Sequence, residues 1–170
     1  MIQASGMRNN VVKVGFAGIL SLVMLSACSS MNTKIGGLFN MDTDLDLTFI
    51  ADKNINPDAN ATPSPLFIRM YELKSDKAFK NADFIDIYER DKEVLGDDML
   101  GKQRLKRLIP GEKREKDFVL DPQTHFVGLF AEFQSYKDAT YKVIIPVEPT
   151  NVVASSSVVR VSGNIISASQ

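Results

Sequence analysis

The sequence contains no tryptophan, one cysteine and one histidine among its 170 residues. A lone cysteine cannot form an internal disulfide bond, so its thiol is buried, reactive or modified. The single histidine, His125, lacks a neighbouring nucleophile motif such as G-x-S-x-G. The acidic run "DTDLD" at 42–46 lacks the glycine and terminal glutamate of a calcium loop. We therefore predict no catalytic residue, no metal site and no cofactor.

Basic patches with interleaved aromatic residues are also lacking, and the formal net charge is -1. This pattern excludes general attraction to nucleic acid. The basic stretch 101–116 could contact an acidic partner or lipid headgroups. Glutamate and aspartate follow its lysines and arginines closely, so a solvated pair of edge strands is the favoured interpretation.

Acidic residues are absent before Asp42, and the first segment has the features of an export signal. Arg8 and Lys13 precede an apolar run at 14–25. That run is shorter than the ~20 residues that a membrane-spanning helix requires. A basic segment, a short apolar run and small residues before a cleavage point are typical of a signal peptide. Either Met1 or Met7 fits as the start of this segment.

The cysteine, Cys28, ends this apolar run. The segment Leu25-Ser26-Ala27-Cys28 resembles the lipobox of bacterial lipoproteins. The resemblance implies a signal peptide at 1–27, diacylglycerol on Cys28 and acylation of the new amino terminus. Residues 28–42 would then be a lipidated tether. Ser29 follows the cysteine where aspartate would signal retention in the inner membrane, which favours the outer membrane. An ordinary secretory signal that happens to contain a cysteine is the alternative.

From Asp44 onward the hydrophobic period is mostly two, which is typical of half-buried strands. In "DLDLTFIA" the apolar residues Leu45, Leu47 and Phe49 alternate with polar ones. Further strand candidates are "PLFIRMYEL", "KQRLKRLI", "KDFVL", "HFVGLFAEF", "YKVIIPV" and "SVVRVSGNII". Seven short strands predict a mainly β domain at 43–170, folded as a two-sheet β-sandwich. The segment 109–112, "IPGE", predicts a type II turn between two antiparallel strands.

A helical insertion at about 75–96 interrupts the strands. Phe84, Ile87 and Tyr88 share one helical face, and Gly96 suits a helix end. The strand at 125–133 is apolar on both faces, so both faces require a partner. We expect the insertion to cover the outer face of one sheet, with Phe79 and Phe84 as anchors.

The connection at 52–64 is the most informative loop. It is rich in asparagine and proline, which favour turns, and at about thirteen residues it exceeds the usual hairpin length. Loops on a rigid scaffold commonly carry recognition, although a passive connection is the alternative.

The ordered set of motifs resembles the TssJ family of type VI secretion lipoproteins. The resemblance rests on the lipobox, "DKNINPDANATPSP", "SPLFIRMYEL", "AFKNADF", "LGDDML", "IPGEK" and "VGLFAEFQSYKDATYK". It implies a transthyretin-like β-sandwich that is lipid-anchored at the outer membrane, faces the periplasm and belongs to the trans-envelope complex. The implied partner is the periplasmic domain of the inner-membrane protein TssM. The implied contact loop contains Asn54, Ile55, Asn56, Pro57, Asp58, Ala59 and Asn60.

Two other classes of protein stay open on sequence grounds. A periplasmic lipoprotein with this fold could bind a carbohydrate or cell-wall ligand. The lack of tryptophan removes the commonest aromatic platform for a sugar. A lipid-anchored hydrolase would need a nucleophile and a base at one site, and no motif supplies them.

Overall fold

The computed structural model describes residues 43–148 and 155–170. The predicted signal peptide, Cys28 and the tether lie outside the described residues. Within the described part of the chain, no helix has both the length and the apolar character needed to cross a membrane.

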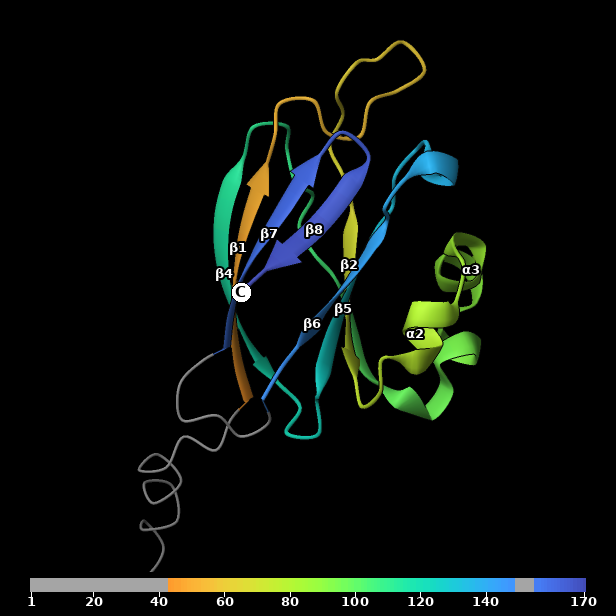
Figure 1. Ribbon diagram of the computed structural model, residues 1–170, viewed down its shortest axis with the longest axis vertical. Helices are drawn as coiled ribbons and strands as arrows, with labels where there is room; N and C mark the ends of the chain where they lie inside the picture. Colours follow the sequence, from red (N-terminus) through yellow and green to blue (C-terminus); the bar gives the residue numbers. More distant parts are fainter. Residues whose placement is uncertain (1–42, 149–154) are drawn as a thin grey trace, which may run out of the picture. The chain divides into compact units, whose positions relative to one another are not determined.

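Residues 43–148 and 155–170 contain eight strands, which form two four-stranded sheets that pack face to face (Figure 1). The first sheet contains, in spatial order, β4 (Lys113–Leu120), β1 (Thr43–Ala51), β7 (Ser155–Ser162) and β8 (Ile165–Ser169). The second contains β3 (Met99–Arg104), β2 (Ile68–Leu73), β5 (Phe126–Ala131) and β6 (Lys142–Pro146). Neighbouring strands are antiparallel except β1 and β7, which are parallel. The predicted mainly β sandwich is confirmed.

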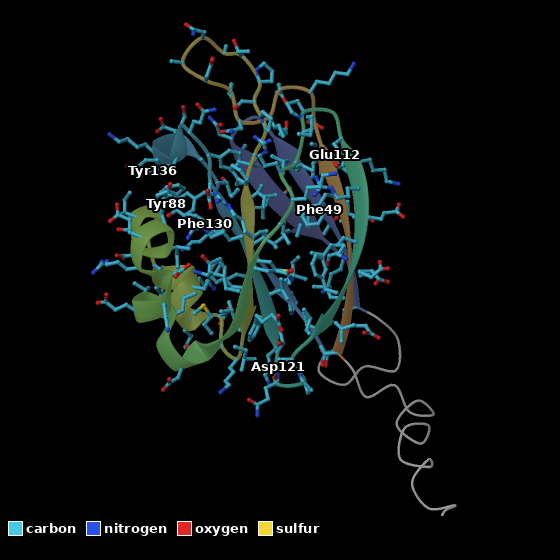
Figure 2. The ribbon with its side chains drawn as sticks, turned by 180° about the vertical axis from the view of Figure 1, so that it is seen from behind. Phe49, Tyr88, Glu112, Asp121, Phe130 and Tyr136 are labelled. Carbon is cyan, nitrogen blue, oxygen red and sulfur yellow. The ribbon has the colours of Figure 1, made fainter. Side chains whose placement is uncertain are left out.

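The core between the sheets follows from the alternation of β1. Leu45, Leu47 and Phe49 are buried there, whereas Asp46 on the opposite face is exposed. Figure 2 shows Phe49 directed between the two layers. Each fully buried leucine or phenylalanine contributes about 1.5–3 kcal/mol of transfer free energy. This alternation fixes the register, because a shift by one residue would place aspartates in the core.

A second apolar core lies between the second sheet and the helices α2 (Lys77–Asn81) and α3 (Phe84–Leu95). Phe79, Phe84 and Ile87 are buried against Phe130 of β5. The ring of Phe79 lies so close to β5 that a Cβ atom added at Gly128 would be 2.9 Å from it. The predicted helical insertion, its two phenylalanine anchors and the burial of β5 on both faces are therefore confirmed.

Lys142 ties α2 to the second sheet. Its ammonium group donates hydrogen bonds to the carbonyl oxygens of Phe79, Lys80 and Ala82 at the carboxyl end of the helix. Carbonyl oxygens at this end have no partner inside the helix, and the helix dipole favours a cation there. Burial lowers the pKa of Lys142.

Two predictions about connections require correction. The apolar segment 157–166 was predicted as one strand, but a turn at Gly163, with φ of 54°, divides it into β7 and β8. The predicted turn at 109–112 is present, since Glu112 N–H donates to the Ile109 carbonyl at 3.0 Å and Gly111 has φ of 81°. It does not close a hairpin, however, because β3 and β4 belong to different sheets.

Candidate functional site

The β1–β2 loop (residues 52–67) projects from one end of the sandwich (Figure 1). The β3–β4, β5–β6 and β7–β8 connections lie at the same end, because β1, β3, β5 and β7 all run toward it. The amino end of β1 lies at the opposite end. A nine-residue strand spans about 30 Å, which separates the start of the domain from this loop.

The loop has a buried neck centred on Asn56, whose φ is 46° and whose side chain is almost fully buried. Its Nδ2 donates to Ser64 Oγ and the Pro65 carbonyl, both at 3.1 Å. Its Oδ1 accepts from the Gln134 N–H at 2.9 Å, and its own N–H donates to the Gly163 carbonyl at 2.9 Å. One side chain thus joins both arms of the loop to the β5–β6 connection.

Beyond the neck, the tip of the loop (residues 57–63) is held by its own hydrogen bonds. Asp58 Oδ1 accepts from the N–H groups of Asn60 and Thr62 at 2.8 and 2.9 Å. The Asp58 N–H donates to the Thr62 carbonyl at 3.0 Å, and the Ala61 N–H donates to the Asp58 carbonyl at 2.9 Å. Residues 59–63 are exposed. The loop therefore presents an ordered, solvent-facing surface.

The structure divides the predicted contact residues into two groups. Asn54, Ala59 and Asn60 are exposed, while Pro57 and Asp58 are half-buried. Ile55 and Asn56 are buried, so in this structure the other residues of the predicted contact loop are the ones open to a partner. Ile55 packs in the core between the sheets, and Asn56 closes the neck. Both residues hold the loop in place on the sandwich.

We expect Asn56→Ala to lower the free energy of unfolding by about 2–4 kcal/mol, because it leaves buried polar groups without partners and keeps the positive φ. Asn56→Gly also removes the amide but relieves the backbone strain, so its stability should lie between those of the parent and Asn56→Ala. Asn60→Ala, in the exposed tip, should change stability by less than about 0.5 kcal/mol. Urea titration followed by circular dichroism measures all three. Equal stability of Asn56→Ala and the parent would contradict a clamping role.

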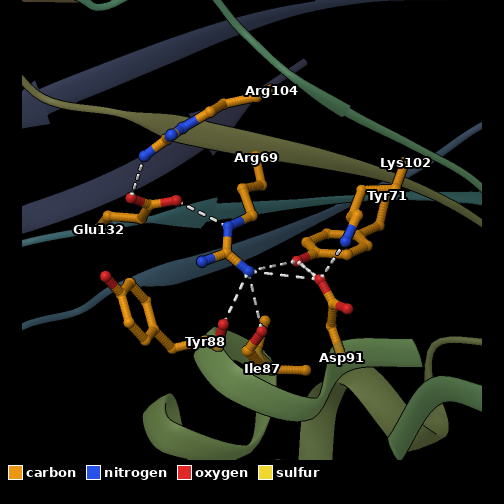
Figure 3. Close-up of polar contacts among 8 residues, drawn as sticks. All are labelled: Arg69, Tyr71, Ile87, Tyr88, Asp91, Lys102, Arg104 and Glu132. Carbon is orange, nitrogen blue, oxygen red and sulfur yellow. Dashed lines mark hydrogen bonds and ion pairs between the residues drawn. The ribbon is translucent and has the colours of Figure 1, made fainter. Parts of the chain in front are cut away.

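A network of charged side chains lies between the second sheet and α3 (Figure 3). Arg69 Nε donates to Glu132 at 2.7 Å, and Arg69 Nη1 lies 3.3 Å from Asp91. Lys102 Nζ reaches Asp91 at 2.8 Å, and Arg104 reaches Glu132 at 2.7 Å. Arg69 Nη1 also donates to the carbonyls of Ile87 and Tyr88, at 3.1 Å each.

These last two bonds stabilise a kink in α3. Arg90 has non-helical φ and ψ of -130° and 29°, so the helix is interrupted there. Backbone carbonyls near such an interruption need other donors. Arg69 supplies one to the turn before the kink, and the guanidinium lies 5.0 and 5.5 Å from the ring centres of Tyr88 and Phe130. Alternation alone would place Arg69 in solvent, so sequence reasoning missed this role.

The protonation states of the network follow from its contacts. Burial alone would raise the pKa of Asp91, but hydrogen bonds from Lys102 and Tyr71 outweigh it and hold that pKa below its ordinary value. Burial raises the pKa of Tyr71, and the bond to Asp91 adds to this effect. At neutral pH, Asp91 is therefore ionised and Tyr71 is a neutral donor.

The remaining candidates for chemistry are not assembled into a site. His125 is exposed at the start of β5, and no serine or cysteine side chain of the described residues bonds to it. Across residues 43–148 and 155–170, no three potential ligands are grouped to hold a metal ion. Each carboxylate oxygen of Glu132 forms an ion pair with an arginine, Arg69 or Arg104.

An ordered loop carried by a rigid β-sandwich is the architecture of a protein-docking module. The chain belongs to the family of type VI secretion lipoproteins that includes TssJ, VasD, EvfM and VC_A0113, whose model matches residues 43–164. The predicted lipid-anchored location at the outer membrane, facing the periplasm, agrees with this membership. No curated protein matches the chain significantly.

Solved structures agree with the family. The type VI secretion lipoprotein TssJ1 from Pseudomonas aeruginosa is 29% identical, with a TM-score of 0.69, over 75% of this chain and 95% of that one. A chain of a structure described as a type VI membrane complex is 28% identical, with a TM-score of 0.65, over 75% and 98%. A chain of a structure described as the TssM C-terminal domain (869–1107) from EAEC is 26% identical, with a TM-score of 0.62, over 75% and 98%.

Proposed function

We propose that this protein is the outer-membrane lipoprotein of a type VI secretion membrane complex and docks the periplasmic domain of a TssM-like inner-membrane protein. The contact surface is the tip of the β1–β2 loop. The observation that carries this proposal is the exposed, internally bonded tip, held on a buried neck by Asn56. The similarity to chains from structures described as a type VI membrane complex and a TssM domain supports the choice of partner.

The same proposal assigns Cys28 as the lipidated residue and residues 28–42 as the tether. In this arrangement the lipid precedes β1 and the loop tip follows the far end of β1. The docking surface would then face away from the membrane. In this proposal the protein acts by binding its partner.

The test replaces residues 57–63 with a Gly-Ser segment of equal length and measures affinity for the partner's periplasmic domain by calorimetry. Binding energy usually concentrates in a few central residues, so we expect at least about a tenfold loss. A matched control replaces Pro122 and Gln123 with glycine and serine. These residues are exposed in the β4–β5 turn beside Asp121, which Figure 2 shows at the opposite end from Glu112.

Melting curves must first show that both variants are folded. Unchanged affinity in the folded tip variant would place the interface elsewhere on the sandwich. Failure of the parent to bind would remove the docking role itself.

A further inference from the structure

A groove of about 390 Å³ opens on the outer face of the second sheet, beside α3. It is lined by Arg69, Tyr88, Lys102, Gln103, Arg104 and Glu132. Figure 3 shows Arg69 from β2, and Lys102 and Arg104 from β3, reaching toward the two carboxylates. The tip of the β1–β2 loop (57–63) contributes no lining residue, although the base of that loop adjoins the groove.

The charges of the groove do not balance. Three cations, Arg69, Lys102 and Arg104, share two carboxylates, those of Asp91 and Glu132. Three positive charges against two negative charges leave the cluster with a net charge of +1. Lys102 and Arg104 are 42% and 55% exposed, so both can contact a ligand as well as their present partners.

Arg69 also has free hydrogen-bonding capacity. Its Nε and Nη1 donate to Glu132, Ile87 and Tyr88, whereas Nη2 has no hydrogen-bond partner among the described residues. Its side chain is 15% exposed and lies close to the rings of Tyr88 and Phe130, which hold it in one orientation. A fixed guanidinium with an unused donor group matches a planar carboxylate, and ordering it costs little further entropy.

We propose that this groove binds an acidic side chain, aspartate or glutamate, of the protein that docks on the β1–β2 loop. The carboxylate would complete the charge balance and accept hydrogen bonds from Arg69 Nη2. The groove is continuous with the loop, since Glu132 N–H donates to the Phe67 carbonyl at 2.9 Å and Gln134 donates to Ser64 Oγ at 2.6 Å. The carboxylate site stands on its own geometry, and only the identity of its donor rests on the proposed function.

The first experiment measures binding of the full-length lipidated protein, in detergent micelles, to the partner's periplasmic domain. The variant Lys102→Gln/Arg104→Gln removes two groove cations. The matched control Lys106→Gln/Arg107→Gln removes two exposed cations from the same segment outside the groove, so the change in net charge is identical. We expect the groove variant to bind about tenfold more weakly and the control to change by less than about threefold.

Charge-conserving Lys102→Arg/Arg104→Lys should bind nearly as the parent does. Equal losses in the groove and control variants would mean a long-range field and overturn the groove contact. If the double variant does not fold, the single Lys102→Gln, at a half-exposed position, should still lose about threefold, and an unchanged affinity would overturn the proposal.

The second experiment needs no partner. Nuclear magnetic resonance of the same protein follows the Nε–H signal of Arg69 during titration with the blocked peptide acetyl-Gly-Glu-Gly-amide and its Gln counterpart. We expect saturable shifts with the Glu peptide alone, at millimolar affinity. No shift would overturn the carboxylate site. If inorganic phosphate bound more tightly than the Glu peptide, the proposal of an acidic protein side chain would be overturned in favour of a lipid headgroup. Shifts with the Glu peptide but no partner binding would retain the site and reject the proposed partner.

Discussion

Replacing Phe79 with alanine is expected to lower the free energy of unfolding by about 3–5 kcal/mol, or the melting temperature by roughly 12–20 °C. Phe79 is fully buried between α2 and β5, and its ring is 5.5 Å from that of Tyr71. Removing the ring leaves a cavity that the helix cannot fill without leaving the sheet. Differential scanning calorimetry measures the loss.

The control comes from the strand beneath the ring. Gly128→Ala places a Cβ atom 2.9 Å from Phe79, so this variant should also be strongly destabilised. In the Phe79→Ala background the clash disappears, and adding Gly128→Ala should cost less than about 1 kcal/mol. Additive losses would mean that the two residues do not share this contact.

Cys28→Ser is expected to release the protein from the membrane completely. Each buried methylene contributes about 0.8 kcal/mol, and one acyl chain alone gives only reversible attachment, whereas three chains anchor stably. Radiolabelled palmitate should enter the parent and not this variant, and membrane fractionation should find the variant in the soluble periplasmic fraction.

Ser29→Asp provides the matching control. It preserves Cys28, so it should still incorporate palmitate, while the aspartate should move the protein to the inner membrane. Equal labelling of the parent and Cys28→Ser would reject lipidation at this cysteine.

Local patterns predicted most of the fold. The alternation of Leu45, Leu47 and Phe49 was enough to identify β1 and its buried face. The apolar residues on both faces of 125–133 predicted a layer on each side of β5, and the first sheet supplies one layer while the helices supply the other. The division of 157–166 was missed, because apolar residues continue on both sides of Gly163 and conceal the turn.

The polar features of the candidate site could not be predicted in the same way. Asparagines in a loop indicate turns and exposure, yet Asn56 is buried because Ser64, Pro65 and Gln134 satisfy its amide. Arg69 depends on Glu132, 63 residues away in sequence. Such partners are brought together by tertiary structure alone, and no sequence period marks them.

The course of β1 has a mechanical consequence. The strand begins at Thr43, directly after the segment proposed as the tether, and ends at Ala51, directly before the proposed docking loop. Tension between a lipid anchor and a bound loop would therefore pass along the covalent backbone of one strand. That strand is already near full extension and could lengthen by only about 5%. Because β4 and β7 flank it without lying in the line of pull, the sandwich could transmit force without any strand sliding past another.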